Sequence, residues 1–294
     1  MIVVTTPTGT IGRQVVHQLL DAGEPVRVIV RDPARLPAEI RDQVRSVIGT
    51  HNDPAVLAQA FADADAVFWL VPPDAQAPSL ASYYVDFTRP AAAALTAHPV
   101  GRVVGISALG RGTPQAAHAG HVTASLAMDD LLAATGVPYR ALTMPSFMDN
   151  LLWQADLIRT QGFFAQPIAG NRKLPTCATR DIATVAVRLL RDSSWTGSGE
   201  VPVLGPEDLS FDEMAQILSE LLHRRVHYRR TPDADYKALL VAQGMSESVA
   251  QGMLDMMRAK NKGLDNAAIR TPDNSTPTTF RQWCEEVLLP VVHR

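Results

Sequence analysis

The sequence predicts an α/β fold: a doubly wound parallel sheet followed by a smaller, mostly helical C-terminal region. Up to about residue 143, short runs of β-branched residues alternate with longer helical stretches, which is typical of strand–helix repeats. A length of 294 residues suits one large domain or two modest ones. We therefore expect a first domain at 1–146 and a C-terminal cap at 147–294, part of which returns to the sheet.

Six β-branched runs are expected to form parallel strands, at residues 2–6, 26–30, 44–48, 66–71, 102–107 and 139–143. The segments between them that suit crossover helices are 12–21, 54–61, 80–97 and 122–134. Right-handed crossovers place a ligand crevice at the carboxyl ends of the strands. Beyond residue 143 we expect helices near 181–190 and 211–222, with no separate series of strands.

Composition excludes several classes of protein. The 27 basic and 30 acidic residues give a net charge of −3, which does not favour a nucleic-acid partner. Two cysteines, Cys177 and Cys284, without a Cys/His cluster support neither a disulfide framework nor a metal site. No apolar run approaches the ~18 residues of a membrane span, and no basic segment precedes the apolar run at 2–4. We expect a cytoplasmic protein without a membrane partner.

The segment TTPTGTIG at residues 5–12 follows the first strand and opens the first helix, as a dinucleotide-binding turn does. Gly9 lets the backbone approach a pyrophosphate, and Gly12 lets the helix pack closely on the strand. The helix N-terminus adds free N–H groups and a positive dipole end. Thr6 replaces the first glycine of the fingerprint, so an ordinary turn without a ligand is the alternative. The candidate cofactor contacts here are Thr6, Thr8, Gly9, Thr10, Ile11 and Gly12.

Arg31 ends the second predicted strand, nineteen residues after Gly12, where a dinucleotide fold holds the adenosine ribose. A carboxylate there favours NAD, whereas arginine offers a planar fork of donors to a 2′-phosphate. Arg35 is a second candidate donor. We predict NADP (NADPH) as the cofactor, with NAD as the alternative. The competing interpretation of Arg31 is a solvated strand end paired with Asp32.

Five segments in order resemble the NmrA-like branch of the atypical short-chain dehydrogenase/reductases, and the likeness covers nearly the whole chain. They are the turn at 5–12, Arg31, FWLVPP at 68–73, GVPY at 136–139 leading to PSFMDN at 145–150, and RDIA at 180–183. The resemblance implies an NAD(P)-binding Rossmann domain with a small C-terminal substrate domain. It also implies cofactor contacts at Thr50, His51, Leu70, Val71 and Pro72.

The catalytic apparatus departs from that of ordinary short-chain reductases, which use a serine after the fifth strand and a Tyr-x-x-x-Lys pair on the next helix. Ser107 matches the serine, but His121 and Ser125 stand at the tyrosine and lysine positions. The ordinary pKa of histidine, about 6.5, suits proton donation near neutral pH, although a capping or surface role is the alternative. Ser107 and His121 are the candidate catalytic residues, and Ser107 and Ser125 are also candidate cofactor contacts.

Without the tyrosine–lysine pair, the favoured chemistry is hydride delivery to an acceptor that is already electron-poor. We expect an NADPH-dependent oxidoreductase of a planar conjugated small molecule, of quinone, iminium or enone type. The alternative is a non-catalytic NADP(H)-sensing regulator that binds a protein partner. The candidate substrate contacts, each with a core-packing role as its alternative, are Pro73, Tyr83, Phe147, Met148, Trp153, Phe164 and Tyr236.

Overall fold

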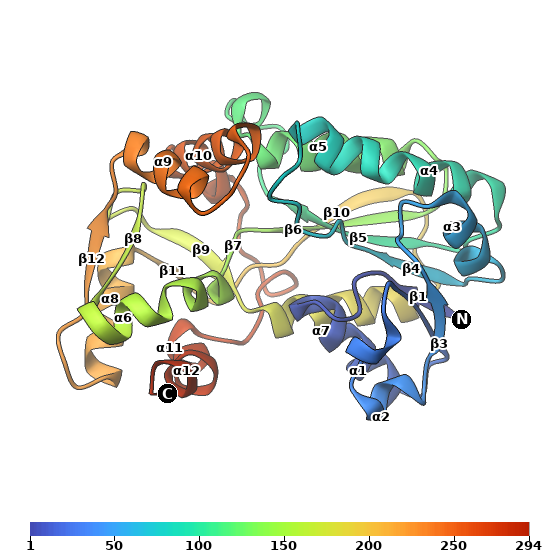
Figure 1. The fold of residues 1–294 in the computed structure, drawn as a ribbon, viewed down its shortest axis with the longest axis horizontal. Helices are drawn as coiled ribbons and strands as arrows, with labels where there is room; N and C mark the ends of the chain where they lie inside the picture. Colours follow the sequence, from blue (N-terminus) through green and yellow to red (C-terminus); the bar gives the residue numbers. More distant parts are fainter. Residues whose placement is uncertain (294) are drawn as a thin grey trace.

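A seven-stranded sheet forms the larger part of the molecule, for which a computed structural model describes residues 1–293 (Figure 1). Every neighbouring pair is parallel, in the order β10-β6-β5-β4-β1-β2-β3. This confirms the doubly wound sheet, and the winding reverses between β1 and β4, which places the crevice at their carboxyl ends. The strands are β1 (Ile2–Val4), β2 (Val26–Val30), β3 (Arg45–Ile48), β4 (Ala66–Trp69), β5 (Val103–Ala108), β6 (Tyr139–Met144) and β10 (Ser198–Pro202).

The seventh strand, β10, corrects the expectation of six strands. It pairs with β6 at the edge of the sheet, where Ser198 lies opposite Tyr139. Its first three residues are exposed. An edge strand of this kind contributes backbone hydrogen bonds but buries little apolar surface, so its sequence carries no apolar run from which a strand is predicted.

Helices cover both faces of the sheet (Figure 1). On one face, α1 (Thr10–Asp21) and α7 (Thr179–Arg191) pack against each other and share a core that includes Val15, Leu19 and Ile182. On the other face, Leu57, Phe61, Leu95 and Met128 join a second core. The helices there are α3 (Pro54–Phe61), α4 (Phe87–Ala97) and α5 (His121–Ala133).

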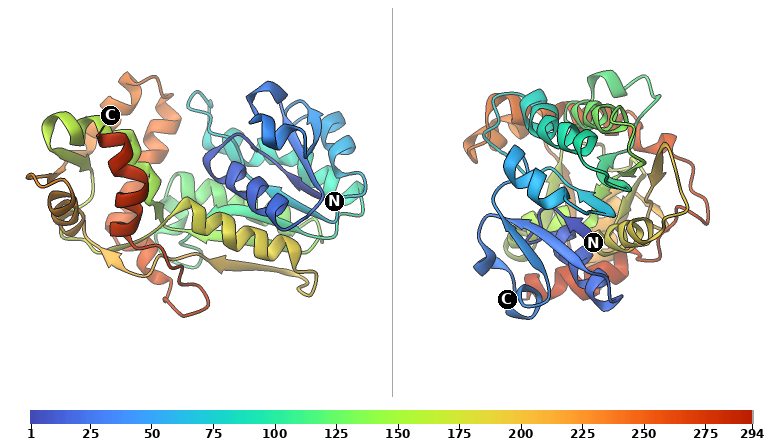
Figure 2. Two further views of the ribbon diagram at one scale, coloured as in Figure 1. Left: turned by 90° about the horizontal axis from the view of Figure 1, so that it is seen from below. Right: turned by 90° about the vertical axis from the view of Figure 1, so that its right-hand side faces the viewer.

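The C-terminal region is mostly helical, as predicted, and its core contains Phe164, Phe280 and Trp283. Its helices are η4 (Met148–Gln154), α6 (Ala155–Gln161), α8 (Phe211–Leu221), α9 (Asp233–Ala242), α10 (Glu247–Asn261), η5 (Leu264–Ala267), α11 (Phe280–Trp283), η6 (Cys284–Leu288) and α12 (Leu289–Val292). The N-terminus and α12 lie at opposite ends of the molecule (Figure 2). Within residues 1–293, no helix has the length and apolar character that crossing a membrane requires.

The expectation that this region has no series of strands was wrong, because it contains two small sheets of order β11-β9-β7 and β12-β8. Each strand has only two to four residues, which is too short to show an alternating pattern. The strands are β7 (Ser146–Phe147), β8 (Phe163–Gln166), β9 (Leu174–Cys177), β11 (Asp208–Leu209) and β12 (His227–Arg230).

The chain passes between the large sheet and the C-terminal region three times: after β6, after β9 and after β10. Asp149 fixes the return into α7, because its carboxylate accepts hydrogen bonds from the amide (3.2 Å) and hydroxyl (2.8 Å) of Thr179. Asp181 on α7 accepts a hydrogen bond from the Thr278 hydroxyl at 2.8 Å. Residues of the PSFMDN and RDIA segments thus join the two parts of the molecule.

Candidate functional site

The turn between β1 and α1 is shaped by two residues. Thr6 adopts a φ of +49°, a left-handed conformation that costs a branched residue more than it costs glycine. At Gly12, a Cβ atom would lie 2.2 Å from the Thr6 carbonyl oxygen, so only glycine lets α1 come this close to the turn. At Gly9, a Cβ atom would come no nearer than 3.4 Å to any neighbour. The protein's own packing therefore does not require glycine at position 9.

The start of α1 suits an anionic ligand. Gly9 is the N-cap residue, no side chain caps the helix, and the first turn holds no acidic residue. Thr8, Gly9 and Thr10 are exposed. The Thr6 hydroxyl is buried without a hydrogen-bond partner. Free N–H groups, a positive helix end and an unpartnered hydroxyl are the features that a pyrophosphate would satisfy, so the turn fits a dinucleotide.

Thr5, a residue that the sequence analysis missed, joins β1 to β4 where the strand order reverses. Its buried hydroxyl donates to the Phe68 carbonyl oxygen (3.0 Å) and accepts from the Leu70 amide (2.9 Å). Leu70, Val71 and Pro72 leave β4 partly exposed along the crevice. The sequence signal that could have identified Thr5 is a threonine at the end of an apolar strand, directly before the glycine turn.

Arg31 lies exposed at the end of β2, and within residues 1–293 it forms no ion pair and no side-chain hydrogen bond. The carboxylate of Asp32 instead accepts the Ala34 amide at 3.0 Å and caps the short helix η1 (Pro33–Arg35). The alternative of a local Arg31–Asp32 pair is therefore not supported. Arg35 is also exposed, in η1. Both guanidinium groups are available to a ligand at the edge of the crevice.

His51 is a buried neutral histidine. Its Nε2 lies 3.0 Å from the Leu70 carbonyl oxygen, and its ring meets Trp69 and Phe87 edge-on. Burial, together with the nearby Arg31 charge, lowers the pKa of His51 to about 4 despite the hydrogen bond to Leu70. Because a carbonyl oxygen only accepts, Nε2 carries the proton. His51 therefore holds the end of β4 in place, and Thr50 beside it is partly exposed.

Ser107, near the carboxyl end of β5, belongs to a buried hydroxyl–carboxyl cluster. Its Oγ contacts a carboxyl oxygen of Asp129 and lies 3.2 Å from Ser125 Oγ. The other carboxyl oxygen of Asp129 accepts the Tyr139 hydroxyl at 2.6 Å. A Cβ atom at Gly105 would lie 2.4 Å from that hydroxyl, so glycine makes room for it. The four polar side chains are 2–7% exposed.

Asp129 is a second residue that the sequence analysis missed. Burial raises its pKa to about 7, although hydrogen bonds from Ser107 and Tyr139 and the charge of Arg111 act in the opposite direction. His121, Ser125 and Asp129 are spaced by four residues on α5 and therefore lie along one side of the helix. This four-residue spacing was the sequence signal that could have pointed to Asp129.

His121 bridges three segments of the chain. Its Nε2 lies 3.2 Å from the Val249 carbonyl oxygen of α10, and its Nδ1 lies 3.2 Å from the Tyr84 hydroxyl. The carbonyl accepts from Nε2–H, so Nδ1 accepts the Tyr84 proton. Burial lowers the pKa of His121. In this arrangement the neutral ring has no free N–H to offer a substrate.

The loop after β4 links the crevice to the C-terminal region. Ser246, the N-cap of α10, donates its hydroxyl to the Ala77 carbonyl oxygen (2.7 Å) and its amide to that of Ala75 (2.8 Å). The same loop leads into η2 (Ser82–Asp86), which carries Tyr83. The residues beyond Leu70 are thereby held against the start of α10.

The residues predicted to contact a substrate are not gathered in one place. Phe164 is 0% exposed and Met148 is 2% exposed, and both belong to the C-terminal core. Trp153 on η4 is 87% exposed. Phe164 and Met148 expose almost no surface to a ligand, so we leave these two out of the proposed site. The predicted contacts that are partly or fully exposed stay candidates, and they are Pro73, Tyr83, Phe147, Trp153 and Tyr236.

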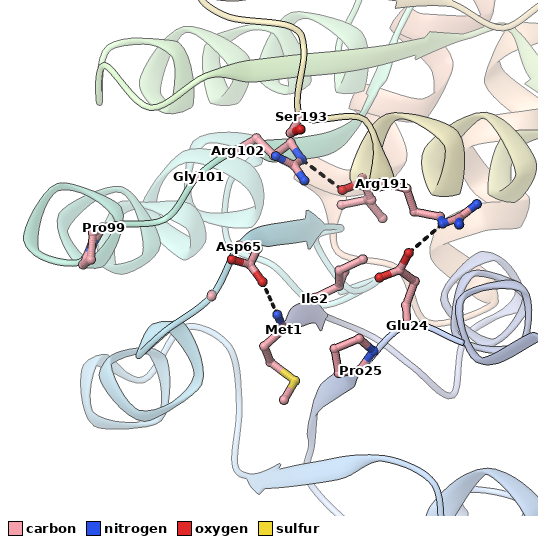
Figure 3. A pocket seen from close by; sticks show the side chains of 12 residues that line it. Met1, Ile2, Glu24, Pro25, Asp65, Pro99, Gly101, Arg102, Arg191 and Ser193 are labelled. Carbon is pink, nitrogen blue, oxygen red and sulfur yellow. Dashed lines mark hydrogen bonds and ion pairs between the residues drawn. The ribbon is translucent and has the colours of Figure 1, made fainter. Parts of the chain in front are cut away.

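A cavity of about 320 Å³ lies elsewhere, at the amino ends of the strands (Figure 3). Its lining includes Ile2 at the start of β1, Pro25 before β2 and Arg102 before β5, whose guanidinium donates to the Leu190 carbonyl oxygen. Parallel α/β sheets bind cofactors at the opposite ends of their strands. This cavity is therefore separate from the candidate site.

Comparisons with known proteins agree with the geometry of the turn. A family model described as NAD(P)H-binding matches residues 7–193. The NAD(P)H azoreductase of Xenophilus azovorans is 30% identical over 259 residues, 87% of this chain and 86% of that protein. The (4-alkanoyl-5-oxo-2,5-dihydrofuran-3-yl)methyl phosphate reductase of Streptomyces griseus is 31% identical over 290 residues, 97% of each. The NADPH-dependent quinone oxidoreductase of Escherichia coli, complexed with NADPH, has the same fold, with a TM-score of 0.79 at 21% identity, covering 100% of this chain and 99% of that one.

The parallel sheet, the glycine turn and the open start of α1 define a dinucleotide-binding protein. The chain belongs to the NAD(P)H-binding family, in the NmrA-like branch of the atypical short-chain dehydrogenase/reductase superfamily. This confirms the predicted family and the nicotinamide cofactor, and it makes an NAD(P)H-dependent oxidoreductase the general class of the protein.

Proposed function

We propose that this protein uses NADPH to reduce planar, conjugated, electron-poor small molecules at a site without the tyrosine–lysine pair. One observation carries the proposal. At the two positions of that pair stand His121, whose ring nitrogens are both bonded within the protein, and Ser125, a buried hydroxyl. Neither supplies a free acid or a cation. An acceptor that is already electron-poor tolerates this, because positioning supplies most of its rate acceleration.

When bound, NADPH supplies the hydride. The open start of α1 would hold the pyrophosphate, and the residues from Leu70 to Pro72 would line the crevice beside it. The unpaired Arg31 would hold the 2′-phosphate with a planar fork of donors, and Arg35 would add a second positive charge. These two arginines support a preference for NADPH over NADH.

Two further observations support the substrate class. The curated relatives are named for an azo group and for an oxo-dihydrofuran that carries an alkanoyl substituent, and both groups are conjugated acceptors. Tyr83 on η2 and Tyr236 on α9 are partly exposed aromatic residues, and Tyr236 packs beside Met253 and Met256 of α10. Flat aromatic rings suit a planar acceptor.

The test is NADPH oxidation against menadione, methyl red, crystal violet and an alkanoyl butenolide, followed by the loss of NADPH absorbance. We expect turnover of at least one acceptor, faster with NADPH than with NADH, and none in Gly9→Val. Tight NADP⁺ binding with no turnover of any acceptor would overturn the proposal and favour a cofactor-sensing regulator.

A further inference from the structure

The Ser107–Asp129 pair addresses a question that the proposed function leaves open, which is where a neutral acceptor obtains its proton. A cationic acceptor needs only a hydride, because hydride addition neutralises it. A quinone or an enone needs a hydride and a proton. His121 has no free N–H, and Ser107 by itself is a weak acid with an ordinary hydroxyl proton.

We propose that Asp129 stores this proton and delivers it through Ser107, so that the pair acts as the acid of the site. This inference rests on the proposed function. Ser107 is the next-to-last residue of β5, at the crevice end of the strand, whereas Asp129 lies behind it and is 3% exposed. Ser107 Oγ contacts both the Asp129 carboxyl group and Ser125 Oγ. Ser107 is therefore the member of the pair nearer the crevice, and Asp129 acts only through it.

The protonation state of Asp129 sets the direction of the Ser107 hydroxyl. When Asp129 is ionised, its carboxylate accepts the Ser107 proton, and the serine has none to give. When Asp129 is protonated, its O–H donates to Ser107 Oγ, and the Ser107 O–H is free to point toward an acceptor. Asp129 with a pKa of about 7 populates both states near neutral pH.

The step balances with one hydride and one proton. The acceptor's conjugated double bond takes the hydride, and its electron pair moves to the terminal oxygen. That oxygen takes the proton as the Ser107 O–H bond breaks, and Ser107 Oγ takes the Asp129 proton as the carboxyl O–H bond breaks. Water then returns a proton to the Asp129 carboxylate.

Charged and titratable groups face Asp129 from each element around it. The Tyr139 hydroxyl of β6 donates to its carboxyl group, and the Arg111 guanidinium lies 3.9 Å away in the loop after β5. The Arg111 guanidinium donates hydrogen bonds to the carboxylates of Glu200 on β10 and Asp130 on α5. The Tyr139 hydroxyl favours the ionised carboxylate, so its removal is expected to raise the pKa of Asp129.

The first experiment compares pH–rate profiles on menadione, a neutral quinone, and crystal violet, a cation. On menadione, we expect kcat of the wild type to fall as pH rises through about 7, and on crystal violet to show no such fall. Asp129→Asn and Ser107→Ala are each expected to lower kcat on menadione at least about tenfold more than on crystal violet. The matched control is Asp156→Asn, at an exposed carboxylate of α6 that pairs with Arg159, which should leave the ratio of the two rates unchanged.

The second experiment uses Tyr139→Phe, which keeps the buried ring and removes only the hydroxyl. We expect the midpoint of the menadione profile to move to higher pH. The carbon-13 resonance of the Asp129 carboxyl group, assigned with Asp129→Asn in protein without cofactor, should titrate near pH 7, and its midpoint should also move to higher pH in Tyr139→Phe. This readout remains decisive even if Asp129→Asn is unstable, because Ser107→Ala then identifies the coupled resonance.

The outcomes are distinct. Two results would overturn the role of Asp129 and leave the proposed function intact. One is that the wild type turns over both acceptors and Asp129→Asn lowers kcat equally on both. The other is that Tyr139→Phe leaves the midpoint of the menadione profile unchanged. An Asp129 carboxyl group that titrates near pH 4 would overturn it independently of any acceptor. No turnover of either acceptor by the wild type would overturn both proposals.

Discussion

Replacing Arg31 with aspartate tests the assignment of the cofactor, because this side chain makes no polar contact within residues 1–293 that the substitution would break. Arg31 is exposed and has no ion pair or side-chain hydrogen bond among residues 1–293. We therefore expect the free energy of unfolding to change by no more than ~0.5 kcal/mol, as for other surface substitutions. The whole effect should appear in cofactor binding.

The size of that effect follows from the contact that is lost. A hydrogen bond to a charged group contributes about 1.5–3 kcal/mol, so Arg31→Asp should weaken NADP⁺ binding roughly 10- to 150-fold. NAD⁺ has no 2′-phosphate, and its affinity should change by less than about threefold. Calorimetric titration measures both, with Arg31→Ser as a variant that removes the donors without adding a negative charge. Equal losses for the two cofactors would refute the assignment.

Three other substitutions test the turn and α5. Gly9→Val should abolish binding of both cofactors with little change in stability, since its Cβ has space in the protein itself; NADP⁺ affinity equal to the wild type would contradict this. Gly12→Ala should destabilise the protein by about 1–3 kcal/mol in urea unfolding, because its Cβ meets the Thr6 carbonyl. The control is Gly199→Ala, which should be near neutral because its Cβ has no neighbour closer than 3.6 Å. His121→Phe should cost about 1–3 kcal/mol by leaving the Tyr84 hydroxyl without its partner. A selective loss of menadione turnover in His121→Phe would restore histidine as the proton donor.

The sheet was predictable because its inner strands are buried on both faces and are therefore continuous apolar runs, such as 2–4 and 66–69. The edge strand β10 was not, because its first three residues are exposed. In the site, the turn at 5–12 was predictable because it directly follows a strand. Asp129 was not predicted: its four-residue spacing from Ser125 places both on one side of α5, but aspartate is seldom fully buried, and the spacing alone does not show that Tyr139 holds the carboxyl group.

The three passages of the chain between the sheet and the C-terminal region also bear on how the molecule moves and folds. A single linker permits free rotation of one part about the other, whereas three separate backbone connections permit only small changes in the angle between the two parts. Any opening of the crevice must bend all three at once. For the same reason, a fragment ending near residue 146 lacks α7 and β10, which leaves the apolar side of α1 and the edge of β6 uncovered. All seven strands of the sheet are therefore present only after about two-thirds of the chain has been synthesised.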